Sequence, residues 1–230
     1  MKRKPTALSR RRALGAALAA TIAAGGAAAA QPLRQAIAGL LDPTPRQGMG
    51  PFYPEAKPLD QDNDLTTIEG ASGRAQGRLI ELAGRILDPA GQPVADARVE
   101  IWQANSFGRY DHSRDRRDTP LDPNFQGYGH DITNSDGAYR FRTIEPAPYP
   151  ASANWMRPPH IHFAVFGPGY GRFVTQMYFA GHPLNARDRL LNGISDAAVR
   201  ARLIVVLQPA PPGSDPEFAV ALFDIVLGAA

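Results

Sequence analysis

The sequence contains no cysteine among its 230 residues. This absence excludes disulfide bridges, thiolate metal sites, a cysteine nucleophile and a lipid attached to cysteine. It sets no limit on stability, because a chain of this length buries enough surface to fold without covalent cross-links. Any metal site must therefore take its ligands from other side chains.

Charged residues are also few, at 20% of the chain against 43% hydrophobic residues. This composition is typical of a folded globular protein rather than a disordered one. The sequence has no glycine-rich phosphate loop before a helix and no serine in a nucleophile-elbow context. The run Arg114–Asp118 is mixed in sign, which predicts a solvated loop rather than a basic stripe, so we expect no nucleic-acid partner.

The excess of positive charge lies at the amino terminus. Residues 1–30 carry six basic side chains and no acidic one, and Ala13–Ala30 is uncharged and rich in small residues. The run Ser9–Leu14 resembles a twin-arginine export signal, so we expect a periplasmic or extracellular protein, cleaved near Ala30, with no stable membrane anchor. An uncleaved amino-terminal helix is the alternative. Without the leader, 19 Lys and Arg face 22 Asp and Glu, and the formal charge changes from +3 to −3.

The rest of the chain is predicted to be all-β, a single β-sandwich with long loops and little helix. Gly and Pro occur 22 times each, and short apolar runs alternate with turn residues. We expect a linker and active-site arm over 31–77 and the catalytic sandwich over 78–230. Turns are predicted at Asp88–Gly91 and Asn134–Gly137 as hairpin connections, and a helix over Arg187–Arg202. The predicted strands are Leu79–Leu87, Arg98–Gln103, Ala138–Ile144, His160–Phe166, Phe173–Phe179, Leu203–Leu207 and Phe218–Leu227.

The sharpest candidate for chemistry is the pair His160 and His162 on a predicted strand. Side chains two apart on a strand lie on the same face, with Cα atoms roughly 6.6 Å apart, so two ring nitrogens can converge on one metal ion. Ile161 and Phe163 would fill the other face, and two buried histidines need a metal or hydrogen bonds. The alternative is a pair of structural histidines bonded to backbone carbonyls.

The sequence near His160 is poor in acidic residues that could serve as further metal ligands. Two tyrosines, Tyr110 and Tyr149, lie at turn-rich positions and are the other candidates. A phenol has a pKa near 10, so it needs a strong Lewis acid to bind a metal as an anion, and iron(III) suits a hard phenolate better than zinc does. Two tyrosines with two histidines would favour Fe(III). Taken singly, each tyrosine is as well explained as a core or turn ring.

Several ordered motifs resemble the intradiol ring-cleavage dioxygenases, most closely the protocatechuate 3,4-dioxygenase β-subunit type. The resemblance runs from about Gly50 to Leu227. It is carried by Gly50–Pro54, Ala97–Asn105, Gly108–Tyr110, Asp122–Phe125, Tyr149–Pro150, Arg157–Phe163 and Thr175–Phe179.

The resemblance implies a non-haem Fe(III) held by four residues of this chain. The implied metal ligands are Tyr110, Tyr149, His160 and His162, with Tyr149 also catalytic because it leaves the metal when a diol binds. Arg157 would stabilise negative charge on the substrate, and Gln176 would have a supporting catalytic role. The alternative for Arg157 is a surface arginine anchored by Trp155.

The implied reaction cleaves a catechol-type diol with O2 between its two hydroxylated carbons, giving a cis,cis-muconate. The short amino-terminal segment favours a protocatechuate-like diol, with Tyr53, Arg109 and Arg157 in the substrate pocket. The resemblance also implies either a homo-oligomer or a separate partner subunit. Two other classes remain open: an exported, non-catalytic β-sandwich binding module, and a histidine-based zinc hydrolase with a carboxylate general base.

Overall fold

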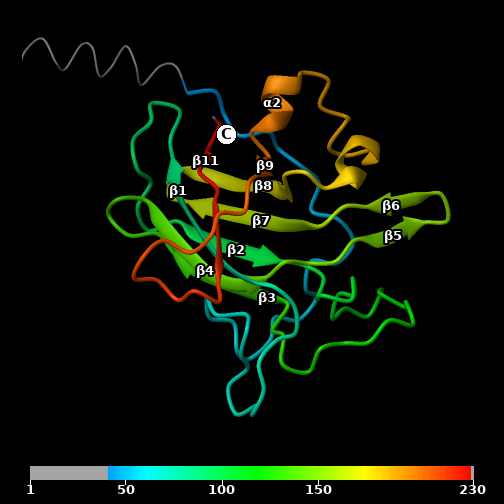
Figure 1. Ribbon diagram of the computed structural model, residues 1–230. Helices are drawn as coiled ribbons and strands as arrows, with labels where there is room; N and C mark the ends of the chain where they lie inside the picture. The colour runs from blue at the N-terminus through cyan, green and yellow to red at the C-terminus, as the bar shows by residue number, and fades with distance from the viewer. Residues whose placement is uncertain (1–40, 229–230) are drawn as a thin grey trace, which may run out of the picture.

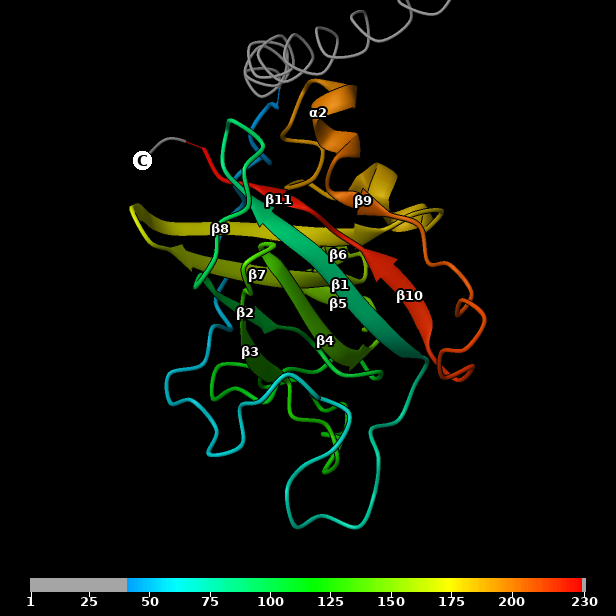
Figure 2. The same cartoon turned by 90° about the vertical axis from the view of Figure 1, so that its left-hand side faces the viewer.

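The computed structural model describes residues 41–228, so the leader predicted for residues 1–30 lies outside the described residues. Two sheets face each other across an apolar core (Figures 1 and 2). One has the strand order β3 (Tyr128–Ile132), β2 (Arg98–Trp102), β7 (His160–Gly167), β8 (Tyr170–Phe179) and β9 (Ile204–Val205). The all-β prediction is confirmed.

The second sheet is built around β1 (Leu79–Leu87), the longest strand in it. Strand β4 (Ala138–Ile144) pairs antiparallel with one edge of β1, and β10 (Ala219–Leu222) and β11 (Ile225–Val226) pair parallel with the other edge. A separate hairpin, β5 (Tyr149–Ser152) with β6 (Trp155–Arg157), projects beside the five-stranded sheet (Figure 1).

The alternation of side chains along β7 divides the protein into two apolar regions. Ile161, Phe163 and Val165 are buried in the core between the sheets. His160, His162 and Ala164 point to the other face, where Ala164 joins a smaller cluster of buried aromatic rings. The candidate site therefore lies outside the sandwich core, between the five-stranded sheet and the loops that cover it.

The segment before β1 covers this outer face. Gln47 donates its backbone N–H to Val174 O (2.9 Å), and the Gln176 side chain donates to Gly48 O (2.8 Å). The segment thus follows β8 before it reaches the site at Gly50. Within residues 41–228, no helix is long and apolar enough to cross a membrane.

Strand predictions were accurate where apolar runs were clear and incomplete elsewhere. Two predicted strands, Leu79–Leu87 and Ala138–Ile144, match β1 and β4 residue for residue. Strands β3, β5 and β6 were not predicted, and the run Phe218–Leu227 is divided into β10 and β11. Both predicted turns form, with Gly91 and Gly137 at positive φ. Asn134–Gly137, however, connects strands of different sheets rather than a hairpin.

The predicted helix over Arg187–Arg202 is wrong. The structure has a 3-10 turn, η1 (Pro183–Arg187), and a helix α2 of only five residues (Ala197–Ala201). Two aspartates interrupt the segment, since Asp188 accepts from Leu191 N (2.8 Å) and Asp196 accepts from the first N–H groups of α2. Carboxylates that take backbone N–H groups compete with a continuous helix and favour caps and turns.

Candidate active site

Pairing between strands places the site residues in rows on the outer face of the five-stranded sheet. His162 lies between Trp102 of β2 and Gln176 of β8, and His160 lies beside Tyr178. The imidazole rings of His160 and His162 are 4.9 Å apart between centroids, and both are almost completely buried. The two rings share one face, as strand alternation requires.

The hydrogen bonds of the two imidazoles show which nitrogen of His160 keeps a lone pair, and they leave Nδ1 of His162 without a partner among the described residues. His160 Nδ1 lies 2.7 Å from Pro158 O, so Nδ1 carries the hydrogen and Nε2 keeps its lone pair. The indole of Trp102 stacks on the ring of His162, 4.8 Å away between centroids. Nδ1 of His162 is buried and has no hydrogen-bond partner among the described residues. Hydrogen bonds thus account for both ring nitrogens of His160, because Nε2 faces Arg157 Nη1 at 3.1 Å, but they leave His162 unexplained.

A glycine brings the two tyrosines together. Gly108 has φ +79, and a Cβ there would lie 2.6 Å from Pro148 O, so only glycine allows this turn to approach the start of β5. The rings of Tyr110 and Tyr149 meet edge to face, 5.5 Å apart between centroids. Tyr110 Oη is 3.4 Å from His160 Nε2. Tyr110, Tyr149, His160 and His162 are therefore assembled in one buried cluster.

Burial sets the protonation states of the four groups. It raises the pKa of the Tyr110 phenol, with a further contribution from the charge of Tyr149. It also raises the pKa of Tyr149, although the Arg157 guanidinium acts in the opposite direction. Burial, and then the charge of Arg157, lower the pKa of both histidines. The imidazoles are thus neutral at pH 7, as metal ligation requires, and the phenols need a cation nearby to ionise.

This donor set fits iron(III). It offers two neutral imidazoles and two phenols that become hard anionic ligands beside a strong Lewis acid. Gly50 leaves space at His162, since a Cβ there would lie 3.1 Å from Cε1 and 3.6 Å from Nε2. No cluster of three His, Asp or Glu side chains suited to a metal occurs in residues 41–228. A zinc hydrolase with a carboxylate base at its metal is therefore not supported by these residues.

Arg157 is buried beside the histidines, which contradicts the alternative of a surface arginine anchored by Trp155. Its Nη1 lies 3.1 Å from His160 Nε2, and its Nε donates to Asp188 (3.0 Å). Nη2 donates to Gln176 Oε1 (3.0 Å) and Tyr178 Oη (2.9 Å). Burial opposes its charge, yet the nearby Tyr178 and Asp188 raise the pKa of Arg157 above its ordinary value. A permanent cation therefore faces the cluster.

The other predicted pocket residues occupy different places. Tyr53 packs edge-on against Trp102 and donates its hydroxyl to the buried carboxylate of Glu100 (2.7 Å). Arg109 points into its own loop, where Nη1 donates to Thr119 O (2.5 Å). Thus Tyr53 supports the wall of the site, and the structure does not bring Arg109 to the four-residue cluster.

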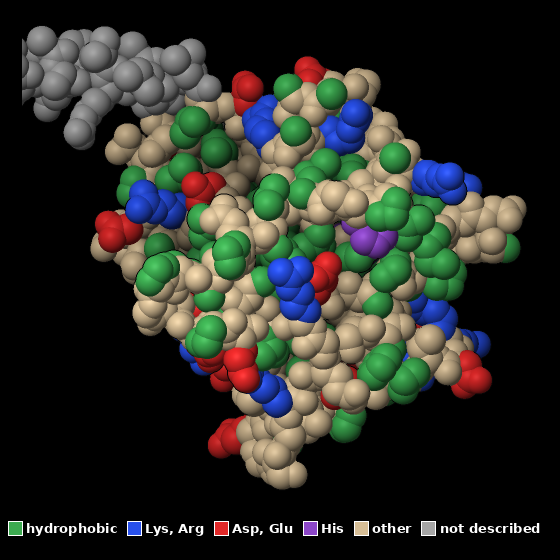
Figure 3. All heavy atoms as spheres, viewed as in Figure 1, with side chains coloured by type: hydrophobic (Ala, Val, Ile, Leu, Met, Phe, Trp, Pro, Cys, Tyr) green, Lys and Arg blue, Asp and Glu red, His purple; other side chains and the backbone are tan. Residues whose placement is uncertain are grey.

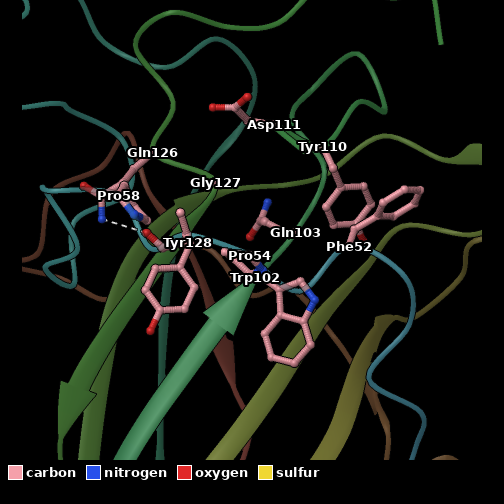
Figure 4. A pocket seen from close by; sticks show the side chains of 11 residues that line it. Phe52, Pro54, Pro58, Trp102, Gln103, Tyr110, Asp111, Gln126, Gly127 and Tyr128 are labelled. Carbon is pink, nitrogen blue, oxygen red and sulfur yellow. Dashed lines mark hydrogen bonds between the residues drawn. The ribbon is translucent and has the colours of Figure 1, made fainter. Parts of the chain in front are cut away.

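A cavity of about 150 Å³ lies beside the cluster (Figure 4). Phe52, Trp102 and Tyr110 line it together with polar residues such as Gln103 and Gln126. Figure 4 shows the rings of Phe52 and Tyr110 lying close together, and their centroids are 4.6 Å apart. The cavity thus shares its aromatic wall with the site.

Sequence analysis missed several residues that build the site. The run Arg114–Asp118 was predicted to be a solvated loop, but the Asp115 side chain is buried and accepts from Tyr110 N (2.8 Å). Arg117 lies over the ring of Tyr149. Asp188 was treated as part of a helix. In a single sequence, nothing distinguishes these charged residues from solvated ones, because their burial is set by the tertiary fold.

A model of the dioxygenase family, described as "Dioxygenase", matches residues 49–229. The protocatechuate 3,4-dioxygenase beta chain of Burkholderia cepacia is 50% identical over 146 residues, which is 62% of each chain. The chain belongs to the intradiol dioxygenase family. A hydroxyquinol 1,2-dioxygenase of Nocardioides simplex is 32% identical over 82% of this chain and 66% of that protein. This intradiol dioxygenase homologue therefore spans slightly less than two thirds of the length of these relatives.

Solved structures of the family share its fold. The dioxygenase domain of a carbohydrate-binding fusion protein from Streptomyces sp. SirexAA-E has a TM-score of 0.61 and 30% identity, covering 82% of this chain and all of that one. Catechol 1,2-dioxygenase from Acinetobacter sp. ADP1 has a TM-score of 0.63 and 28% identity, and the match covers 89% of this chain and 69% of that one.

The buried neutral histidines predict that the metal-free protein loses stability in mild acid. Their pKa values are lowered on folding, so below pH about 6.5 the unfolded chain binds protons that the folded protein does not. Above pH about 6.5 these two histidines should not change the free energy of unfolding. Below it, each histidine should lower the free energy of unfolding by up to about 1.4 kcal/mol per pH unit. Urea unfolding at pH 7.5 and 5.5 measures this, and His162→Gln is expected to reduce the loss of unfolding free energy between the two pH values. Equal losses in wild type and His162→Gln would contradict the prediction.

Proposed function

We propose that this protein is a non-haem iron(III) dioxygenase that cleaves the ring of a catechol-type diol between its two hydroxylated carbons, using O2 and yielding a cis,cis-muconate. The observation that carries the proposal is the convergence of Tyr110, Tyr149, His160 and His162 in one buried cluster. These four residues would hold the iron, which supplies Lewis-acid activation of a chelated diol. A non-catalytic binding module would have no need of such a carboxylate-free donor set.

Arg157 would balance negative charge on the bound diol. Its Nη1 lies next to His160 Nε2, and its other nitrogens are held by Asp188, Gln176 and Tyr178. A fixed cation in a water-poor site stabilises developing negative charge without having to reorganise. Gln176 acts here by holding Arg157 and Gly48 rather than by facing the diol.

Tyr149 is the residue that would accept a proton from the diol. Burial raises the pKa of its phenol, so the Tyr149 phenolate has a high proton affinity at Oη. Tyr110, which is stacked against Phe52, would stay in place. The two tyrosines thus have different proposed roles: Tyr149 accepts a proton at Oη, and Tyr110 does not.

The substrate class we propose is a protocatechuate-like diol, by similarity to the Burkholderia cepacia relative. That relative is named as one chain of an assembly, so we also propose that this protein works as an oligomer, with copies of itself or with a partner subunit. The leader supports a further proposal, that the mature protein acts outside the cytoplasm. On the face shown in Figure 3, basic side chains are scattered among acidic ones, which suits a small diffusible substrate.

The proposed function is tested by oxygen uptake with catechol, protocatechuate and hydroxyquinol. The iron-loaded protein should consume O2 with at least one of these diols and form a product with the ultraviolet spectrum of a muconate. Hydroquinone, whose hydroxyls are not adjacent, should give no uptake because it cannot chelate one metal ion through both oxygens. Absence of uptake with all three diols, in protein that contains iron, would refute the assignment.

A further inference from the structure

An arginine outside the donor set lies directly over one of the two tyrosines. Cζ of Arg117 is 4.4 Å from the centroid of the Tyr149 ring and 5.8 Å from that of Phe52. Phe52 in turn stacks on Tyr110, whose ring meets Tyr149 edge to face. Arg117, Phe52, Tyr110 and Tyr149 therefore form a closed ring of four side chains, each in contact with the next.

Asp115 holds the guanidinium of Arg117 by one edge. Its Oδ1 accepts from Arg117 Nε (2.7 Å), and its Oδ2 pairs with Nη2. The same Oδ2 accepts the backbone N–H of Tyr110 (2.8 Å). One carboxylate thus connects the backbone of the first tyrosine to the cation that covers the ring of the second.

These contacts differ from those of an ordinary surface ion pair. The side chain of Asp115 is 1% exposed and that of Arg117 is 19% exposed, whereas a solvent-exposed pair contributes about 0–1 kcal/mol. Because two nitrogens of the Arg117 guanidinium are bound to Asp115, the group is held with its Cζ over the Tyr149 ring. Their neighbour Arg116 is exposed and offers a matched comparison.

We propose that Asp115 and Arg117 form a clamp that sets the position of the Tyr149 ring relative to Tyr110. The inference rests on the proposed iron(III) site, and it makes Arg117 a positioning residue. Arg117 holds Tyr149 by its face and does not contact the donor oxygen, so the ring is kept at its place while Oη remains available. Asp115 fixes Arg117 and Tyr110 together, so that both tyrosines reach the metal at a defined spacing.

The test compares Arg117→Met and Arg117→Lys with Arg116→Met. Methionine keeps an apolar side chain on Tyr149 but removes the guanidinium. Lysine keeps the positive charge but lacks the planar guanidinium with its several donors. The measurements are iron affinity by titration of the metal-free protein and the position of the tyrosinate-to-iron absorption band. Loss of an outer partner of a metal ligand typically weakens metal binding by about 10–100-fold, and we expect that range for Arg117→Met, with a shifted band.

Arg117→Lys should have the same iron affinity and absorption band as Arg117→Met, because a lysine ammonium cannot bind Asp115 through two nitrogens and cover the Tyr149 ring at the same time. The clamp is contradicted if Arg117→Met matches Arg116→Met in affinity and band, or if lysine restores wild-type values. Should Arg117→Met fail to fold, Asp115→Asn provides the same test with an isosteric change, and unaltered affinity and band would contradict the clamp. Wild-type protein without an iron band would refute the proposed function itself, so the two failures are distinguishable.

Discussion

Replacing His160 by alanine is expected to abolish iron binding. His160 Nε2 is the nitrogen that keeps a lone pair, because Nδ1 donates to Pro158 O, and it lies 3.4 Å from Tyr110 Oη. Removal of a metal ligand should lower iron affinity by more than the ~100-fold typical of losing an outer hydrogen-bond partner. The iron content of protein purified after loading, measured by atomic absorption, checks this, and activity should fall with it.

Two further variants make the result specific. Tyr149→Phe should retain most of its iron, because the ring still packs under Arg117 and three ligands remain, yet it should lose most of its activity with the proton-accepting Oη. His182→Ala, at the start of η1, should retain both iron and activity. If His160→Ala bound iron as well as wild type, His160 would have to be removed from the ligand set.

Asp188→Ala is expected to be the most destabilising of the single substitutions considered. The side chain of Asp188 is fully buried, and it accepts from Arg157 and from Leu191 N. Its removal would leave a buried guanidinium without its carboxylate, a change that typically costs about 3–5 kcal/mol of unfolding free energy. Urea unfolding monitored by tryptophan fluorescence provides the measurement.

The exposed pair Arg74–Glu217 supplies the control for this experiment. Its partners are 38% and 65% exposed, so Glu217→Ala should change stability by less than about 1 kcal/mol. The loss of unfolding free energy in Asp188→Asn should lie between those of Asp188→Ala and Glu217→Ala, since the amide oxygen can still accept hydrogen bonds but lacks the charge. If Asp188→Ala lowered the free energy of unfolding by less than about 1 kcal/mol, other groups would have to compensate the buried charge of Arg157, which would contradict the role of Asp188 as its partner.

The sequence alone was sufficient for the parts of the protein with a local signal. The apolar alternation of β1 and β4 predicted these strands with their boundaries, and the spacing of His160 and His162 predicted their shared face. A pleated strand has a fixed period of two, so such inferences need no knowledge of the rest of the chain.

Other parts depend on contacts that no local pattern reports. The short strands β5 and β6 contain Pro150 and polar residues, and Tyr149 pairs with Arg157 across the hairpin. The burial of Asp115 depends on Arg117 and on the Tyr110 backbone. The helix prediction failed because apolar spacing was counted without the aspartates that take backbone N–H groups. Charged residues acquire such roles from tertiary structure, which a local pattern does not contain.

The proposal that two tyrosines and two histidines of this chain hold iron(III) can be tested by the visible spectrum of the iron-loaded protein. We expect a broad tyrosinate-to-iron(III) absorption that shifts when catechol or protocatechuate is added and that is absent from His160→Ala. A colourless protein that carries zinc, or that takes up no metal even after iron loading, would contradict it.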